Sequence, residues 1–185
     1  GYRSIQYRHD RAVWNGEDVP FRLEFFHRGY LYRDRVDIHL IEDGEILPVE
    51  FEPNMFQYDR GRPDDIDADL GFAGLRIVAH PQGSAPFEAV SFLGASYFRA
   101  VPLEGVYGAS ARGIAVNTAV TGTKEQFPAF RKFWVIRPQH DAEVLVVFAL
   151  LDGQSLTGAY RFDINPGQET VMHVRSHLYV RNPIK

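Results

Sequence analysis

The chain has 185 residues, 45% of them hydrophobic and 24% charged, which suits one domain with a sizeable core and indicates neither a disordered chain nor a membrane-spanning segment. Its net charge of -4 at pH 7 argues against nucleic acid as a partner, because a protein that binds phosphates needs a basic surface. The absence of cysteine excludes disulfides and thiolate metal sites, and it agrees with the cytoplasm and the periplasm alike. We predict no metal and no other cofactor.

Apolar and polar residues alternate along most of the chain with the period of a half-buried β-strand, as Phe21, Leu23 and Phe25 do. Turn signals separate consecutive runs, for example at residues 42–44 and 165–167. The predicted strands are residues 5–7, 21–25, 36–40, 46–51, 71–78, 87–93, 96–101, 109–119, 134–136, 144–151, 158–164 and 170–180. About a dozen short strands predict an all-β fold, an antiparallel β-sandwich that forms one domain over residues 1–185.

Three segments depart from this alternation. Residues 52–69 combine proline and glycine with five aspartates and predict a long loop, which is either functional or a solvated surface. The aspartates do not follow the spacing of an EF-hand, so no calcium site is predicted. Residues 125–134 offer the one short helical turn. The apolar run at residues 144–151 predicts a strand that is buried on both faces.

Two near-duplicate stretches, GASYFR at residues 94–99 and YGASARG at residues 107–113, lie in the middle of the chain. Each puts small residues beside an arginine, Arg99 or Arg112, and an aromatic residue, Tyr97 or Tyr107. Guanidinium donors can bind hydroxyl groups, and aromatic rings can cover the apolar C–H face of a sugar. The pattern therefore fits a carbohydrate-binding wall. The alternative is a tight strand pair whose arginines form structural salt bridges.

Further candidates lie outside these stretches. Trp134 joins Tyr97 as a residue predicted to stack on a sugar ring, with a place in the core as the alternative. Asp152 follows an apolar strand and precedes Gly153, so it is either a catalytic acid or the cap of a turn. On a strand, His173 and His177 would lie about 13 Å apart, which favours surface residues over metal ligands.

Six stretches follow one another along the chain: residues 70–74 (LGFAG), 92–100 (FLGASYFRA), 107–115 (YGASARGIA), 127–134 (FPAFRKFW), 149–152 (ALLD) and 157–162 (TGAYRF). In this order they resemble the periplasmic glucan biosynthesis proteins of the MdoG/OpgG and OpgD type. The resemblance covers nearly the whole chain. It implies a periplasmic protein of osmoregulated periplasmic glucan synthesis, built on a galactose-mutarotase-like β-supersandwich and binding a β-1,2-linked glucan backbone.

The resemblance also implies that residues 1–185 are the N-terminal part of a larger glucan-processing domain. Family members resemble inverting glycoside hydrolases, and their acid and base carboxylates fall beyond the part matched here. The catalytic residues of this chain are therefore unknown, and Asp152 takes a structural or pocket-edge role. The expected substrate-binding residues are Tyr97, Arg99, Tyr107, Arg112, Trp134 and Asp152.

Two functions remain open from the sequence, beside a purely structural role that predicts no glucan affinity. The first is a part of a periplasmic protein that binds and processes β-1,2-glucan, and the second is a non-catalytic glycan-binding or scaffold module of the cell envelope. The expected partner is a β-glucan oligosaccharide or polysaccharide. Uncovered sheet edges also predict pairing with a second copy of the chain as a homodimer.

Overall fold

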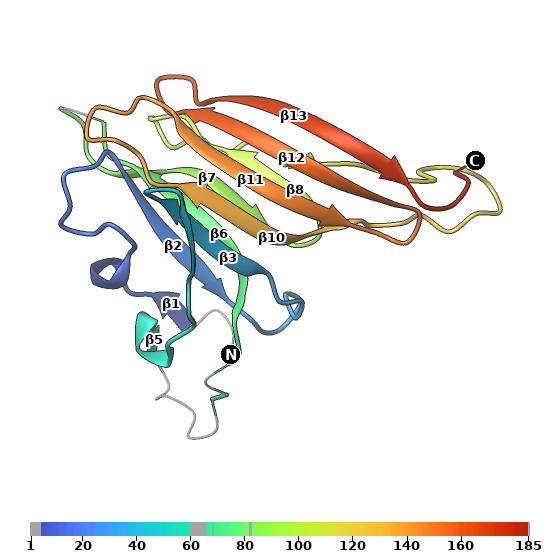
Figure 1. The fold of residues 1–185 in the computed structure, drawn as a ribbon, viewed down its shortest axis with the longest axis horizontal. Coiled ribbons are helices and arrows are strands. Elements are labelled where there is room, and N and C mark those ends of the chain that lie inside the picture. The colour runs from blue at the N-terminus through green and yellow to red at the C-terminus, as the bar shows by residue number, and fades with distance from the viewer. Residues whose placement is uncertain (1–4, 60–65, 68, 82, 185) are drawn as a thin grey trace.

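The computed structural model describes residues 5–59, 66–67, 69–81 and 83–184. Two β-sheets lie face to face, and a short two-stranded sheet lies beside them (Figure 1). The six-stranded sheet has the order β13 (Val171–Val180), β12 (Leu156–Asn165), β11 (Leu145–Asp152), β10 (Ala129–Ile136), β3 (Asp37–Glu42) and β4 (Glu45–Pro48). The five-stranded sheet has the order β2 (Phe21–His27), β6 (Phe72–Ala79), β7 (Phe87–Leu93), β8 (Tyr97–Ala100) and β9 (Ala111–Arg112). The small sheet pairs β1 (Ile5–Tyr7) with β5 (Phe56–Tyr58), and two short 3₁₀ helices are η2 (His9–Arg11) and η3 (Pro53–Met55).

The core fills the space between the two larger sheets. Phe92 of β7 packs against Phe133 of β10 and Phe162 of β12, with ring centroids 5.2 and 5.0 Å apart. Alternate residues of each strand point into this layer, because successive side chains of a strand lie on opposite faces. The predicted all-β sandwich is therefore confirmed, and the galactose-mutarotase-like form of it stays a prediction.

The described strands pair antiparallel, as predicted, with one exception: β10 pairs with β3 in parallel. A parallel neighbour needs a long crossover connection, and here four of the five strands of the five-stranded sheet, β6 to β9, lie between β3 and β10 in sequence. Strand β11 is buried on one face, and residues on its other face are half-buried. Its continuous apolar run therefore does not mark a strand covered on both sides.

The helical turn predicted at residues 125–134 is wrong, because β10 occupies residues from Ala129 onward. The register of β10 against β11 shifts between Phe130 and Lys132. This β-bulge places Phe130 and Phe133 on the same inward face, so two buried aromatic residues stand three apart, a spacing that is typical of a helix. The sequence pattern was that of a bulged strand.

The strand predicted at residues 109–119 shrinks to the two residues of β9. Asn117 and Ala119 have φ angles of 58°, which a regular strand does not contain. The only further pairing of this segment among the described residues is the isolated bridge between Val116 and Gln126.

The segment predicted as a long loop, residues 52–69, contains η3 and β5. Strand β5 pairs with β1 so that Phe56 lies opposite Tyr7. The rings of these two residues lie 5.2 Å apart, edge to face, and both are buried. The part of the loop at residues 60–65 and 68 lies outside the described residues.

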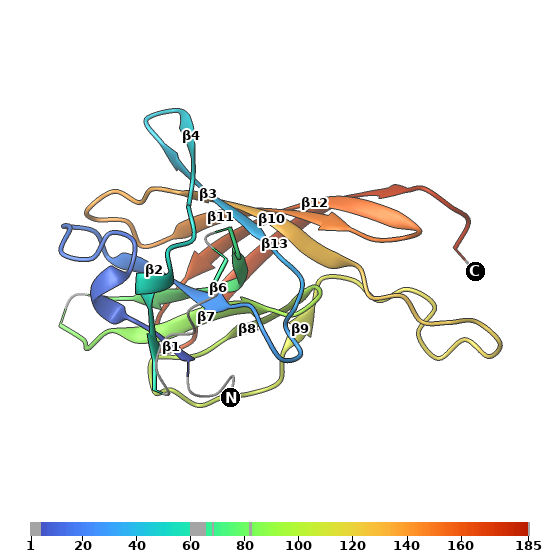
Figure 2. The same ribbon diagram turned by 90° about the horizontal axis from the view of Figure 1, so that it is seen from below.

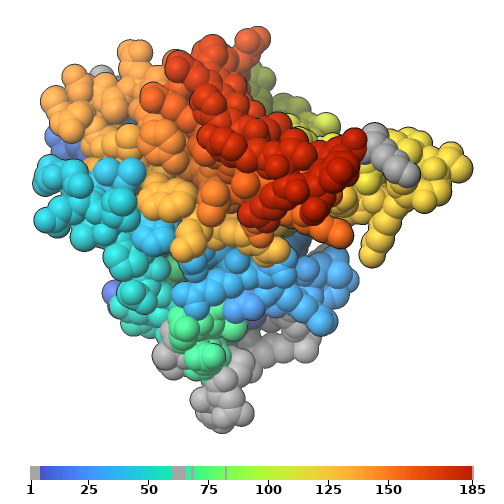
Figure 3. Space-filling model, turned by 45° about the vertical axis from the view of Figure 1, so that its right-hand side comes forward, coloured from blue at the N-terminus to red at the C-terminus, as the bar shows by residue number. Residues whose placement is uncertain are grey.

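The two edges of the six-stranded sheet are exposed. Strand β4 projects from the body of the molecule (Figure 2), and β13 lies across the surface (Figure 3). His173 and His177 are exposed on β13, as predicted for surface residues. No helix within the described part of the chain is long and apolar enough to cross a membrane.

Candidate functional site

The two near-duplicate stretches lie side by side in the structure. The first forms the turn between β7 and β8, where Gly94 has a φ of 79° and Ala95 a φ of 45°, and the second ends in β9, which pairs with β8. The Gly113 amide donates to the Ser96 carbonyl at 2.8 Å. A Cβ at Gly113 would lie 3.0 Å from Cζ of Phe130, so a small residue is needed at this position. The alternative interpretation as a tight strand pair is therefore correct for the backbone.

The side chains of the strand pair that point away from the core line a hollow of about 610 Å³ on the outer face of the five-stranded sheet. We call it the outer-face groove. Tyr97, Arg99 and Tyr107 line it, together with Phe26, Tyr32 and Glu88. Three of the six predicted binding residues thus meet in one cavity.

Arg99 has polar and aromatic neighbours in this groove. Its Nε and Nη2 donate to Oγ of Ser110 at 3.2 and 3.1 Å. Its guanidinium carbon lies 5.7 Å from the centre of the Tyr107 ring. Within the described residues no carboxylate forms an ion pair with it, and a guanidinium carries five N–H donors. Arg99 therefore keeps donor capacity for the hydroxyl groups of a ligand.

Arg112 has a different environment. Its Nη1 lies 2.9 Å from Oε1 of Glu125, and its guanidinium lies over the rings of Tyr97 and Phe127, at 5.7 and 5.2 Å. The structural salt bridge that the alternative interpretation predicted is present for this arginine. Arg112 supports the Tyr97 ring at the end of the groove rather than lining the groove itself.

Trp134 and Asp152 lie away from the groove, on the other sheet. Trp134 is half-buried on β10, next to His39 of β3, with the two rings stacked at 5.7 Å and 18°. Asp152 ends β11 and forms an ion pair with Arg181, in which Oδ1 of Asp152 lies 2.7 Å from Nη1 of Arg181. The six predicted residues therefore do not form one site.

A chain of charged groups crosses the outer face beside the groove and was not predicted. The Glu24 carboxylate is buried, and its Oε2 lies 3.4 Å from Nε of Arg76. Nη1 of Arg76 lies 3.3 Å from Oε2 of Glu88, which lines the groove. The sequence signal for these charged groups is that Glu24 and Arg76 each stand between apolar residues of a predicted strand. The sequence does not show that β2 and β6 are neighbours.

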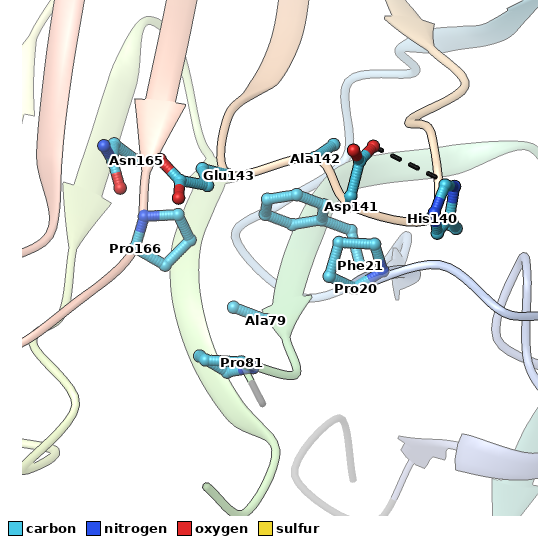
Figure 4. A pocket seen from close by; sticks show the side chains of 10 residues that line it. All are labelled: Pro20, Phe21, Ala79, Pro81, His140, Asp141, Ala142, Glu143, Asn165 and Pro166. Carbon is cyan, nitrogen blue, oxygen red and sulfur yellow. Dashed lines mark ion pairs between the residues drawn. The ribbon is translucent and has the colours of Figure 1, made fainter. Parts of the chain in front are cut away.

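A second hollow, of about 470 Å³, lies at one end of the sandwich (Figure 4). His140, Asp141 and Glu143 come to it from one loop, and Pro20 and Pro166 from two others. Nδ1 of His140 lies 3.9 Å from Oδ1 of Asp141, and both side chains are largely exposed. This hollow contains no predicted binding residue and no arginine. Among the described residues no group of three metal-binding side chains exists, here or elsewhere.

A family model described as periplasmic glucan biosynthesis protein, MdoG, matches residues 1–185. The chain belongs to this family. It is 46% identical to glucans biosynthesis protein G of Rhodopseudomonas palustris, over 97% of the chain and 36% of that protein. It is 44% identical to glucans biosynthesis protein D 1 of Ralstonia nicotianae, over 100% of the chain and 34% of the relative. For glucans biosynthesis protein G of Vibrio cholerae the identity is 42%, over 97% of the chain and 33% of the relative. The chain thus spans about a third of the length of these curated relatives.

Proposed function

We propose that this chain supplies a glucan-binding groove to a periplasmic glucan biosynthesis protein, and that the ligand is a β-1,2-linked glucan backbone. The observation that carries the proposal is the meeting of Tyr97, Arg99 and Tyr107 in the outer-face groove. The family description supports the periplasm as the compartment.

The groove has the two kinds of surface that a sugar needs. The rings of Tyr97 and Tyr107 are 37% and 58% exposed, so they offer apolar faces to the C–H face of a pyranose. Arg99 and Ser110 offer donors and an acceptor to its hydroxyl groups. A neutral ligand also suits a site in which the nearby carboxylates Glu24 and Glu88 are already paired with Arg76.

We assign binding, rather than bond cleavage, to this chain. Inverting hydrolysis needs one carboxylic acid and one carboxylate, held about 6.5 to 9.5 Å apart on either side of the scissile bond. The carboxylate that lines the groove, Glu88, is paired with Arg76. This agrees with the resemblance, which implies catalytic carboxylates beyond the matched part. A non-catalytic glycan-binding or scaffold role in the cell envelope is the second candidate.

Calorimetric titration of the chain with linear β-1,2-gluco-oligosaccharides tests the proposal. Arg99→Ala removes donors to a ligand, and a hydrogen bond from a charged group contributes about 1.5 to 3 kcal/mol, so we expect an affinity loss of about tenfold or more. The matched control is Arg175→Ala on the exposed edge strand β13, which should bind as the unmodified chain does. Equal affinity of the Arg99 variant, or no binding by the unmodified chain, contradicts the proposal. A reducing-end assay on the same samples should show no cleavage, and new reducing ends would refute the assignment of binding alone.

A further inference from the structure

Glu24 is a buried carboxylate on a face of β2 that points away from the core. Its neighbours Leu23 and Phe25 point inward, yet Glu24 itself is only 3% exposed. Its Oε1 contacts Nδ1 of His9. Its Oε2 has no hydrogen-bond partner among the described residues, and Arg76 Nε is 3.4 Å away. Burial of a charged carboxylate is unfavourable unless other groups compensate it, so the two contacts with His9 and Arg76 keep Glu24 in place.

His9 joins this buried carboxylate to the solvent. It lies in η2, and its side chain is 81% exposed. A carboxylate accepts hydrogen bonds, so the Nδ1–H group of a neutral His9 ring donates a hydrogen bond to Glu24, and Nε2 carries the lone pair. The contact thus selects one tautomer and fixes the orientation of the ring. An exposed Nε2 held in this way is a preorganised acceptor.

His9 also lines a hollow of about 280 Å³ that adjoins the outer-face groove. Gln6, Phe26 and Arg76 line this hollow with it. The two cavities share Phe26, and the ion pair from Arg76 to Glu88 joins one to the other. This hollow repeats the combination of polar and apolar surfaces of the outer-face groove. It offers the Gln6 amide, the His9 imidazole and the Phe26 ring beside the Arg76 guanidinium.

We propose that the hollow at His9 is a second carbohydrate subsite, in which Nε2 of His9 accepts a hydrogen bond from a sugar hydroxyl. Glu24 is the positioning residue, since it acts only through the tautomer and orientation of His9. This inference rests on the proposed function, because the sugar that reaches His9 is a continuation of the glucan bound beside Arg99. A glucan long enough to pass Phe26 contacts both cavities, and a short glucan binds in the outer-face groove alone.

Two ligand lengths separate the subsite from the groove. We would titrate the 185-residue chain with a β-1,2-linked disaccharide and with a hexasaccharide. In His9→Ala we expect unchanged disaccharide affinity and a hexasaccharide affinity lower by about two- to tenfold, the effect of one hydrogen bond. The matched control is His140→Ala, which removes another exposed histidine beside a carboxylate and should bind both ligands normally.

The outcomes distinguish the two proposals. If Arg99→Ala weakens both ligands and His9→Ala weakens neither, the subsite is wrong and the groove stands. If the unmodified chain binds neither ligand, both proposals fail.

Nitrogen NMR of the His9 ring gives a readout that does not depend on affinity. We expect the Nδ1–H tautomer in the unmodified chain and a shift of the Nε2 resonance when hexasaccharide is added. Glu24→Gln keeps the shape of the side chain but removes its charge, so the Nδ1–H tautomer should lose its dominance and hexasaccharide affinity should fall in part. An Nε2–H tautomer in the unmodified chain, or an Nε2 resonance that does not respond to saturating hexasaccharide, overturns the proposal.

Discussion

Arg99 and Arg112 each follow a Gly-Ala-Ser run in two similar stretches of sequence, yet their surroundings differ. Ser110 and the Tyr107 ring contact Arg99. Arg112 instead pairs with Glu125, from the segment that returns toward β10. The fold of that segment brings Glu125 to Arg112. The resulting ion pair removes Arg112 from the set of free donors. Only Arg99 is therefore assigned to direct contact with a ligand.

Trp134→Ala should reduce stability and leave glucan binding unchanged. The indole is half-buried and stacked on His39, on the sheet opposite the groove. Since truncation removes part of a large apolar surface, we expect a loss of about 1 to 2 kcal/mol in the free energy of unfolding, less than the roughly 3 to 5 kcal/mol of a fully buried tryptophan. Urea denaturation and calorimetric titration of the same variant measure both quantities. Weaker binding with unchanged unfolding would restore Trp134 to the binding site.

His27 should make stability depend on pH. Burial lowers the pKa of its imidazole, against the smaller opposite effect of the hydrogen bond with the Arg28 carbonyl. Because the unfolded pKa is about 6.5, the unfolded chain binds more protons than the folded chain below that pH. The contribution is complete above about pH 6.5 and is lost as the pH falls through the window down to the lowered folded pKa.

The variant His27→Phe tests this effect, since it keeps an aromatic ring beside Phe51 and Phe56 and removes the titrating group. Unfolding free energies at a series of pH values should fall less steeply below about pH 6.5 in the variant than in the unmodified chain. Parallel curves for the two proteins would assign the pH dependence to other groups.

At the level of single residues, the sequence singled out three residues that line the groove but not the charged groups beside it. Tyr97, Arg99 and Tyr107 could be found because they lie in two stretches that pair locally. Glu24 and Arg76 could not, because their contact requires the register of β2 against β6, which a single sequence does not contain. Trp134 was assigned because it is an aromatic residue in one of the six motifs, and neither its type nor its motif says which sheet the side chain lies on.

Among the elements, alternation identified most strands and failed where the backbone is irregular. The turn at residues 42–44 was found because a two-residue hairpin needs positive φ angles, which Asp43 and Gly44 have at 50° and 82°. The bulge in β10 was missed, since one extra residue changes the period of the buried side chains from two to three. Such an insertion depends on the partner strand and leaves no local signature.

The small residues of the second stretch should differ in their tolerance to substitution. A Cβ at Gly113 would lie 3.0 Å from Cζ of Phe130 and 3.2 Å from Cβ of Ser96, whereas a Cβ at Gly108 meets no atom within 4 Å. Gly113→Ala should therefore cost about 1 to 3 kcal/mol of stability through overpacking. Gly108→Ala is the matched control and should stay within about 0.5 kcal/mol. Equal unfolding free energies for the two variants would show that the strand pair is less tightly packed than described.

For the whole molecule, the sandwich separates two surfaces that the sequence places close together. Trp134 and the groove residues occur in neighbouring family motifs, but they lie on the outer faces of opposite sheets. The all-β class and the two-sheet arrangement could be predicted from alternation and hairpin spacing. The strand order could not, because the parallel pairing of β3 with β10 joins segments that lie far apart in the chain.

Self-association through β13 stays a prediction of the exposed sheet edge. This strand has one described neighbour, β12, and carries exposed apolar residues that include Val174 and Leu178. A free apolar edge favours pairing with another strand, and a lysine on that edge opposes it. We expect sedimentation to show a dimer that Val174→Lys converts to a monomer, while Val144→Lys, which precedes β11, leaves the dimer intact. A monomeric unmodified chain would contradict the predicted homodimer.

The most direct test of the central proposal is a map of the amides that a glucan perturbs. The backbone amides of the isotopically labelled chain would be followed by NMR while a linear β-1,2-gluco-oligosaccharide is added. Binding in the outer-face groove predicts saturable shifts at residues 94–99 and 107–112, with Trp134, Asp152 and residues 140–143 unaffected. Shifts confined to the Trp134 face or to the loop at residues 140–143, or no saturable shift anywhere, would contradict a glucan-binding groove beside Arg99.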